Sequence, residues 1–164
     1  MRILKNIFSH LHIFLLWAVL SAMLWAWIFT FVTDTSPDKK VTVYCHVPEV
    51  KSTELAVALE KNMPEGLKMI KVHSFDYVMF DTESIGRGDI FIIPASEIEP
   101  FFEDIAPVGD ENGIRVYDSE TGIGIGLEYI SYGDEDHYLF LGAGSVHLED
   151  GKALAVAEEL LKMK

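Results

Sequence analysis

The chain has 164 residues, which is enough for one compact domain and a short additional segment. It is strongly acidic, with 26 Asp and Glu residues against 13 Lys and Arg residues, and it lacks the basic stripe that a nucleic-acid-binding protein needs. Its single cysteine, Cys45, excludes an internal disulfide.

Near the N-terminus, residues 13–32 form an uninterrupted apolar segment, IFLLWAVLSAMLWAWIFTFV, without a charged residue. At about 1.5 Å per residue, a helix of this length is about 30 Å long, which matches the core of a bilayer. The segment is longer than the apolar part of a secretory signal, and no A-x-A-like cleavage site follows it. The sequence therefore predicts an uncleaved transmembrane helix, with the lipid bilayer as a partner.

The charges beside this segment bear on its orientation. Arg2 and Lys5 precede it without an acidic residue among them, which favours an N-terminus inside the cell. Lys39 and Lys40 follow it closely and count against that orientation. We expect the N-terminus inside, which gives a membrane anchor with a short basic N-terminus (residues 1–33), a polar linker (34–40) and an extracytoplasmic α/β domain (41–164).

Small residues recur along one side of the predicted anchor. Ala18, Ala22 and Ala26 are spaced four residues apart, with Ser21 beside them. Such a stripe lets two helices approach closely in lipid, so it predicts helix pairing and a homodimer through the anchor. The alternative is ordinary composition, because alanine is common in membrane helices.

The first half of the domain alternates strand-like and helix-like segments. This order is typical of βαβ crossovers and predicts an α/β fold. A nearly all-apolar run at residues 89–94 suits a strand that is covered on both faces. Residues 75–84 are ambiguous, with a helical face as one interpretation. In chain order we expect a strand at 41–47, a helix capped by Ser52 or Thr53 and ending near Lys61, strands at 67–73 and 89–94, and a short helix capped by Ser96 that continues through Ile105.

The second half of the domain consists mainly of strand-like segments rather than alternating strands and helices. Residues 114–117, 123–130 and 138–141 are strand-like and are separated by turn sequences, so they predict an antiparallel meander in a mixed sheet. Asp150 then caps a C-terminal amphipathic helix. The residues expected on its buried side are Leu154, Val156, Ala157, Leu160 and Leu161.

Few residues are spaced for chemistry. The sequence GAGS at residues 142–145 lacks the Lys-Ser/Thr of a phosphate loop and predicts a tight turn. The histidines are scattered without a metal-ligand spacing, and residues 134–136 lack the ligand order of an EF-hand. Ser145 and His147 lie two apart on a predicted strand, where side-by-side residues rarely form a nucleophile–base pair. We therefore expect no metal, no cofactor and no enzymatic activity.

Three stretches carry a resemblance to a known family. They are SFDYVMF at residues 74–80, GRGDIFIIPASEIEPFF at 86–102 and YLFLGAGSVH at 138–147. Together they resemble the first lobe of the extracellular solute-binding proteins of bacterial ABC importers. The resemblance implies a periplasmic-binding-protein-like lobe that recognises a solute or contacts importer subunits. Members of that family have two lobes closing on a ligand, and this chain has room for one.

Ligands of open α/β sheets lie at the carboxyl ends of the strands, and the resemblance implies the same position. As an alternative to solute binding, the chain is a non-catalytic membrane-associated accessory protein that uses its α/β lobe as a protein-interaction surface. For each predicted ligand-binding residue the alternative role is ordinary turn or capping work. These residues are His46 and Glu49 after the first strand, Ser74, Asp76 and Tyr77 after the second, and Ala95, Ser96 and Glu97 after the third.

Overall fold

The computed structural model describes residues 11–33, 35–75, 86–109 and 113–163, except for the side chains of residues 12 and 30–33. The chain divides into two compact units, Met1–Thr35 and Ser36–Lys164. Each unit is described separately below.

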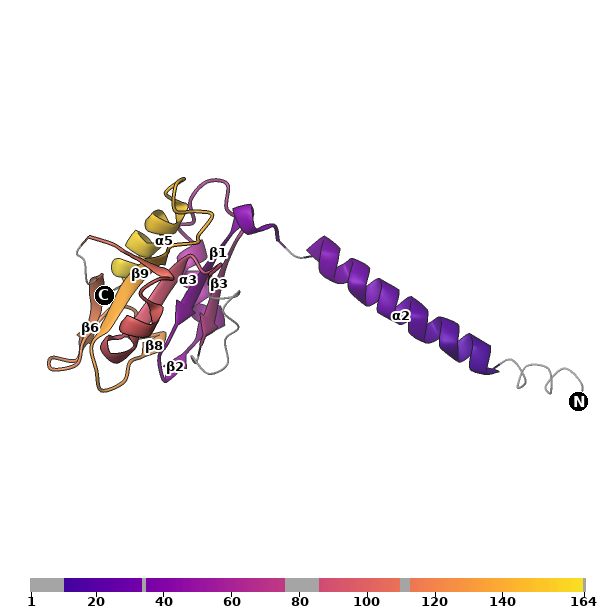
Figure 1. Ribbon diagram of the computed structural model, residues 1–164, viewed down its shortest axis with the longest axis horizontal. Coiled ribbons are helices and arrows are strands. Elements are labelled where there is room, and N and C mark those ends of the chain that lie inside the picture. Colours follow the sequence, from indigo (N-terminus) through magenta and orange to yellow (C-terminus); the bar gives the residue numbers. More distant parts are fainter. Residues whose placement is uncertain (1–10, 34, 76–85, 110–112, 164) are drawn as a thin grey trace, which may run out of the picture. The chain divides into compact units, whose positions relative to one another are not determined.

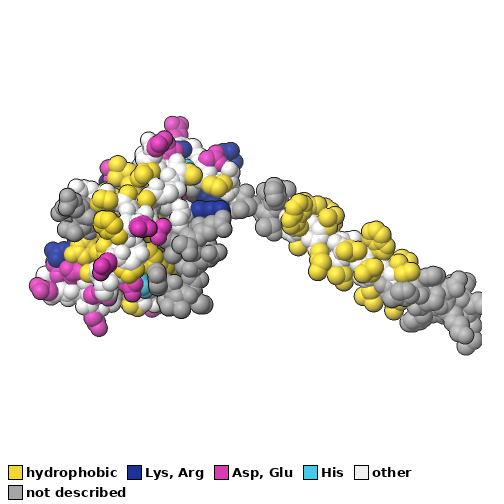
Figure 2. All heavy atoms as spheres, in the orientation of Figure 1, with side chains coloured by type: hydrophobic (Ala, Val, Ile, Leu, Met, Phe, Trp, Pro, Cys, Tyr) yellow, Lys and Arg dark blue, Asp and Glu magenta, His cyan; other side chains and the backbone are white. Residues whose placement is uncertain are grey.

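The described part of the first unit forms the helix α2 (Leu11–Thr33), which is 23 residues long. It has no Gly or Pro to interrupt it, and Leu, Ala and Met are strong helix formers. On the face drawn in Figure 2, hydrophobic side chains line the described part of α2, whereas acidic side chains are spread over the second unit. Within the described residues, no helix reaches the length and apolar character required to cross a membrane. The predicted span of residues 13–32 ends in side chains that lie outside the described set.

The second unit is built on a mixed seven-stranded sheet (Figure 1). Strand β1 (Lys40–Cys45) is parallel to both neighbours, and β9 (His137–Gly142) is antiparallel to every strand that it pairs with. The α/β class with a mixed sheet and a C-terminal helix is therefore confirmed. The strand order is β3 (Met69–Ser74), β1, β4 (Ile90–Pro94), β9, β6 (Ile114–Asp118) and β7 (Ile123–Gly124), and β5 (Ile105–Pro107) also pairs with β9.

Two hydrophobic cores lie on opposite faces of this sheet. On one face, α3 (Ser52–Glu60) and α5 (Lys152–Leu161) cover the aliphatic side chains of the central strands. On the other face, an aromatic cluster lies beneath the 3₁₀ turns η3 (Ala95–Glu97) and η4 (Glu99–Phe101). Strand β4 serves both cores, because Ile90 and Ile92 point to the helices and Phe91 and Ile93 to the aromatic cluster. This double burial explains why its sequence is nearly all apolar.

The predicted helix from Ser96 through Ile105 is wrong. The segment forms the two 3₁₀ turns, and Ile105 begins β5, whose backbone pairs with β9. Pro100 lacks the N–H that a continuous α-helix needs, and the pairing with β9 satisfies the backbone instead. Ser96 does not cap the segment, because Pro94 holds the N-cap position.

The predicted strand at residues 123–130 is also wrong in its middle. β7 ends at Gly124, and Gly126 has a positive φ of 57°, a conformation that breaks an extended strand. The chain resumes as β8 (Ile130–Ser131), which pairs with β2 (Glu49–Val50) in a separate two-stranded sheet.

The helix ends differ from expectation in detail. Lys51, rather than Ser52 or Thr53, is the N-cap of α3 and makes no side-chain cap. Gly151 is the N-cap of α5, while the carboxylate of Asp150 accepts the backbone N–H of Lys152 at 3.0 Å. Ala153 takes the buried place in the first turn that was expected of Leu154, which is exposed. The ambiguous segment at residues 75–84 lies outside the described residues, apart from the buried Phe75. The linker prediction for 34–40 is modified by η1 (Pro37–Lys39).

Candidate functional site

A cleft opens where the parallel strands β1, β3 and β4 end. It has a volume of about 460 Å³, within the range of small-molecule sites. Its walls come from the carboxyl ends of these three strands and from the loop that leads into β9. The residues lining it are His46, Val47, Pro48, Ser74, Phe75, Pro94, Gly133, Glu135 and His137.

Two of the predicted ligand-binding residues meet in this cleft. Tyr44 and Cys45 of β1 lie in register with His73 and Ser74 of β3, which brings the following residue, His46, beside Ser74. Glu49 lies in β2, where it pairs with Ser131, and is not among the lining residues.

The third predicted group lies just beyond the lining. Ala95, Ser96 and Glu97 form η3 directly after Pro94. The N–H of Ala95 donates to the backbone oxygen of Asp136 at 2.9 Å, and the N–H of Ser96 donates to the carboxylate of Glu135 at 3.1 Å. These contacts hold the wall of the cleft. The remaining predicted residues, Asp76 and Tyr77, lie outside the described part of the chain.

Glu135 and His137 were missed from the sequence. They reach the cleft because β9 runs antiparallel to β4 with His137 opposite Pro94. No local pattern reveals a pairing between strands that are more than 40 residues apart. One sequence signal could have pointed to these two residues: the polar turn sequence GDED directly precedes the strand that begins at His137.

His46 gives the cleft its clearest chemical feature. Its ring nitrogen Nδ1 is buried and has no hydrogen-bond partner. The ring is held in place, because it packs against Phe75 with centroids 5.2 Å apart and its backbone N–H donates to the oxygen of Ile92 at 2.8 Å. A buried polar atom without a partner costs about 1–3 kcal/mol. An imidazole nitrogen can donate or accept a hydrogen bond, but this Nδ1 is shielded from solvent, so a ligand in the cleft reaches it only if the ring or its neighbours move.

His137 forms a rigid, neutral wall next to His46. It is almost completely buried, and burial lowers its pKa, so the ring is uncharged at neutral pH. Its Nδ1 lies 2.8 Å from the backbone oxygen of Glu135, and the ring also forms a hydrogen bond with the backbone of His46. Tyr132 and Tyr117 stack on each other, with ring centroids 4.6 Å apart, and both present their faces or edges to His137.

The rim of the cleft is acidic. Glu135 lines it, and Asp134 and Asp136 flank that residue in the sequence. Hydrogen bonds from Ser119 lower the pKa of Asp136, which stays ionised and pairs with Arg115 at 3.4 Å. Such a field disfavours anionic solutes and favours neutral or cationic ones. Within the described residues, no group of three His, Cys, Asp or Glu side chains is placed to hold a metal ion.

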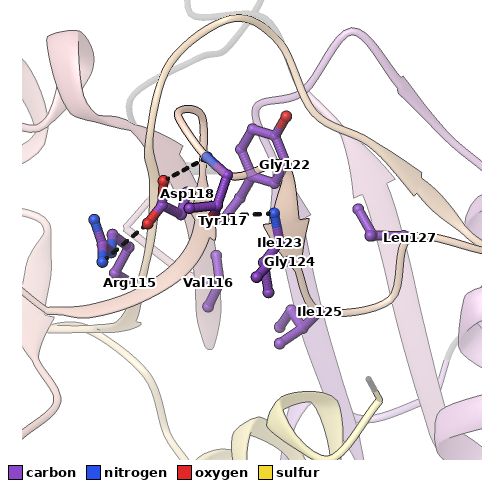
Figure 3. A pocket seen from close by; sticks show the side chains of 10 residues that line it. Arg115, Val116, Tyr117, Asp118, Gly122, Ile123, Gly124, Ile125 and Leu127 are labelled. Carbon is purple, nitrogen blue, oxygen red and sulfur yellow. Dashed lines mark hydrogen bonds and ion pairs between the residues drawn. The ribbon is translucent and has the colours of Figure 1, made fainter.

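A second pocket lies beside the hairpin of β6 and β7 (Figure 3) and has a volume of about 570 Å³. It contains none of the predicted site residues. Its apolar side chains include Ile123 and Leu127, both exposed. Its charged groups are already used, because Arg115 pairs with Asp118 at 3.2 Å and Asp118 also accepts two turn N–H groups. This pocket therefore presents apolar surface, and its charged side chains already have partners.

At the opposite end of the strands, where β1 and β4 begin, the carboxylate of Asp89 forms the centre of a buried polar network. It accepts the backbone N–H of Thr42 at 2.7 Å and the hydroxyl of Ser145. Burial raises the pKa of Asp89, against the lowering effect of these two hydrogen bonds. The backbone N–H of His147 donates to the oxygen of Ser145 at 3.0 Å, while the His147 ring contacts Asp150. The ring nitrogens of His147 lie within hydrogen-bonding distance of Asp150, Pro37 and Lys40, so the contacts of the ring go to the loop and the linker.

The glycines of the GAGS sequence lie at the same end of the strands. A Cβ atom at Gly142 would overlap the backbone oxygen of Gly88, and one at Gly144 would overlap that of Gly86. The backbone N–H of Gly142 donates to the oxygen of Asp89 at 3.0 Å. These glycines therefore permit the end of β9 and the turn after it to pack against the backbone of residues 86–88, and the N–H of Ser145 closes the turn on the oxygen of Gly142 at 3.1 Å.

Comparison with known proteins assigns no family to this architecture. No protein-family model, no curated protein and no solved structure matches the chain. The resemblance to solute-binding proteins therefore stays a prediction that these comparisons neither support nor contradict.

Proposed function

We propose that this protein is a membrane-anchored, extracytoplasmic solute-binding-protein-like domain that binds a small neutral or cationic solute and acts beside an ABC importer. The observation that carries the proposal is His46, which lines a cleft at the carboxyl ends of parallel strands and has a buried Nδ1 without a hydrogen-bond partner. Ser74 and Glu135 line the same cleft and add a hydroxyl and a carboxylate. Together they provide hydrogen-bonding groups of different polarity around one small volume.

The membrane anchor is the second part of the proposal. It is supported by the charge-free segment at residues 13–32 and by the large apolar side chains exposed along α2. The basic residues Arg2 and Lys5 support an extracytoplasmic domain. Protease added to intact cells should digest the domain from outside; protection until the cells are lysed would contradict the orientation, provided that lysis then permits digestion.

Ligand-induced stabilisation tests the binding function. A solute that binds the folded state raises its free energy of unfolding by RT ln(1 + [L]/Kd), or about 2.7 kcal/mol at a concentration of 100 times Kd. Amino acids, short peptides, polyamines and monosaccharides should be screened by thermal unfolding of the wild type and of His46→Leu. We expect at least one neutral or cationic compound to raise the Tm of the wild type alone. A screen in which none does so contradicts solute binding.

The second candidate is an accessory protein that uses its lobe as an interaction surface. The exposed Ile123 at the β6–β7 pocket favours it, because this side chain is 71 % exposed. Under this alternative Ile123→Ser reduces partner binding, whereas His46→Leu has no effect on it.

A further inference from the structure

We propose that the buried ring of His147 carries two protons, and therefore a positive charge, at neutral pH, and that loss of one proton at higher pH releases Asp150 from the ring. We call the contacts of the ring with Pro37, Lys40 and Asp150 the linker latch. The latch joins the segment that leads into β1 to the loop before α5. The inference concerns the domain alone and depends neither on the membrane anchor nor on the cleft.

One side of the ring faces hydrogen-bond acceptors that never carry a proton. The ring nitrogen Nε2 lies 3.1 Å from the backbone oxygen of Pro37 and 3.1 Å from that of Lys40. A carbonyl oxygen accepts hydrogen bonds and cannot donate them. Nε2 must therefore carry a hydrogen, which it shares between η1 and the first residue of β1.

The other side of the ring faces a carboxylate. Nδ1 lies 3.1 Å from Oδ2 of Asp150. Lys152 contacts the same carboxylate twice, because its Nζ lies 2.7 Å from Oδ2 and its backbone N–H donates to Oδ1 at 3.0 Å. These hydrogen bonds from Lys152 lower the pKa of Asp150, so the carboxylate stays ionised and offers acceptors only. Nδ1 must therefore carry a hydrogen as well.

A neutral ring cannot satisfy both sides of the latch. Neutral imidazole has one N–H group and one lone pair, whereas both groups are donors in the protonated ring. In a neutral ring the lone pair would face either the carboxylate of Asp150 or the two carbonyl oxygens. The side chain of His147 is 1 % exposed, so water is not available to place a hydrogen between them.

The charged groups around the ring can compensate a buried positive charge, which is costly unless it is paired and hydrogen-bonded. Asp150 is bonded to the ring, and Asp89 interacts with it electrostatically. Burial raises the pKa of Asp89, and the positive ring acts in the opposite direction. The charged side chains that the surrounding elements contribute are Asp38, Lys39 and Lys40 at the start of β1, Arg87 and Asp89 before β4, Glu149 and Asp150 in the loop, and Lys152 in α5.

The side of Asp150 is the one that opens when the ring loses a proton. Its side chain is 39 % exposed and can turn to water, whereas the acceptors on the other side are backbone oxygens. We expect the neutral ring to keep its hydrogen on Nε2, which leaves the lone pair of Nδ1 against the carboxylate. Asp150 then moves away, and the backbone N–H of Lys152 loses its acceptor. The latch thus links the protonation of one buried side chain to the first turn of α5.

The test counts the protons on the ring directly. The full chain is labelled with ¹⁵N at histidine only and is kept in detergent solution, and the ring signals are recorded by two-dimensional ¹H–¹⁵N NMR. Ring nitrogens with and without a proton resonate at different frequencies, and His147→Gln assigns the signals of His147. His73 is the internal reference, because partial burial and the charges of Lys71 and Lys40 lower its pKa and leave it neutral at about pH 7.5.

At about pH 7.5 we expect protons on both ring nitrogens of His147 and on one ring nitrogen of His73. Raising the pH to about 10 should remove the proton from Nδ1 of His147 and leave that on Nε2. A single protonated nitrogen on His147 at the lower pH overturns the inference. A ring that still carries both protons at the higher pH overturns the pH-sensitive release.

Two matched variants test the role of Asp150. Asp150→Asn introduces an amide that can donate to Nδ1, so the ring should carry a proton on Nε2 alone at about pH 7.5. Glu149→Gln removes the same charge one residue away, from an exposed side chain, and should leave both ring nitrogens protonated. Two protons on the ring in Asp150→Asn, or the same loss in both variants, overturns the assignment of Asp150 as the partner of the charge.

Discussion

The two ends of the central sheet differ in how their buried polar groups are satisfied. At the end where β1 begins, Asp89 and His147 are each bonded to two or more partners from distant parts of the chain. At the end where β1 stops, His46 keeps a buried ring nitrogen without a partner and faces an open cleft. Both ends carry histidine and carboxylate side chains, so composition alone does not distinguish them.

The difference teaches which end maintains the fold and which end is available for binding. A satisfied network stabilises the packing of loops, and removing one member leaves its partners buried and unpaired. An unsatisfied buried group costs stability, so its presence calls for an explanation, and binding of a ligand is the one proposed above. The predictions below compare equivalent substitutions at the two ends.

The largest effect is expected from glycine substitution. Gly142→Ala places a Cβ atom on the backbone oxygen of Gly88, which cannot rotate away as a side chain could. We expect a loss of about 3 kcal/mol in the free energy of unfolding, measured by urea denaturation. The control is Gly133→Ala at the cleft, where the nearest atom is 3.7 Å away on Pro48, and it should change stability by less than about 0.5 kcal/mol. Equal losses at the two positions would contradict the contrast.

Histidine substitution gives the next largest effect. His147→Leu removes the ring contacts to Pro37, Lys40 and Asp150 and should cost about 2–3 kcal/mol. His46→Leu replaces an unpartnered polar atom with an apolar group, so it should be neutral or stabilising by up to about 1 kcal/mol. A loss at His46 as large as that at His147 would mean that the cleft histidine maintains the fold.

The pH dependence of stability provides a smaller effect. Burial lowers the pKa of His137, so the unfolded state takes up a proton more readily than the folded state. This group therefore contributes stability above its unfolded pKa of about 6.5, and that contribution is lost as the pH falls toward the folded pKa. Asp89 acts in the opposite sense, because its raised pKa relieves a penalty as the pH falls. The free energy of unfolding of the wild type should thus decrease more between pH 7.5 and 5.5 than that of His137→Gln; parallel curves would contradict the assignment.

Much of the fold could be predicted because its signals are local. The apolar run of β4 follows from burial on both faces of the sheet, and the alternation in β1 places Val41, Val43 and Cys45 in the aliphatic core. The helix at residues 96–105 was mispredicted because the segment forms two short 3₁₀ turns, and its last residue, Ile105, begins a strand that pairs with β9, a partner distant in the sequence. The strand at 123–130 failed at Gly126, whose positive φ redirects the chain into a second sheet.

The candidate site was predictable only where it depends on the chain order of parallel strands. His46 and Ser74 follow two such strands directly, so the rule for strand ends locates them. Glu135 and His137 enter through the antiparallel pairing of β9 with β4, which no local pattern specifies. The contacts of the His147 ring with the backbone oxygens of Pro37 and Lys40 could not be predicted from the sequence either, because these partners are more than 100 residues away.

The most direct measurement is a ligand titration of residues 36–164, the second compact unit, followed by two-dimensional ¹H–¹⁵N NMR. The ligand is the compound that raises the Tm most in the thermal screen, and His46→Leu is the control. We predict that backbone shifts concentrate at His46, Ser74 and His137 in the wild type, and that they disappear in His46→Leu, while the signals of Ser145 and His147 stay unchanged. Shifts that concentrate at the β6–β7 pocket or around His147, or that persist in His46→Leu, would contradict the assignment of the cleft as the binding end.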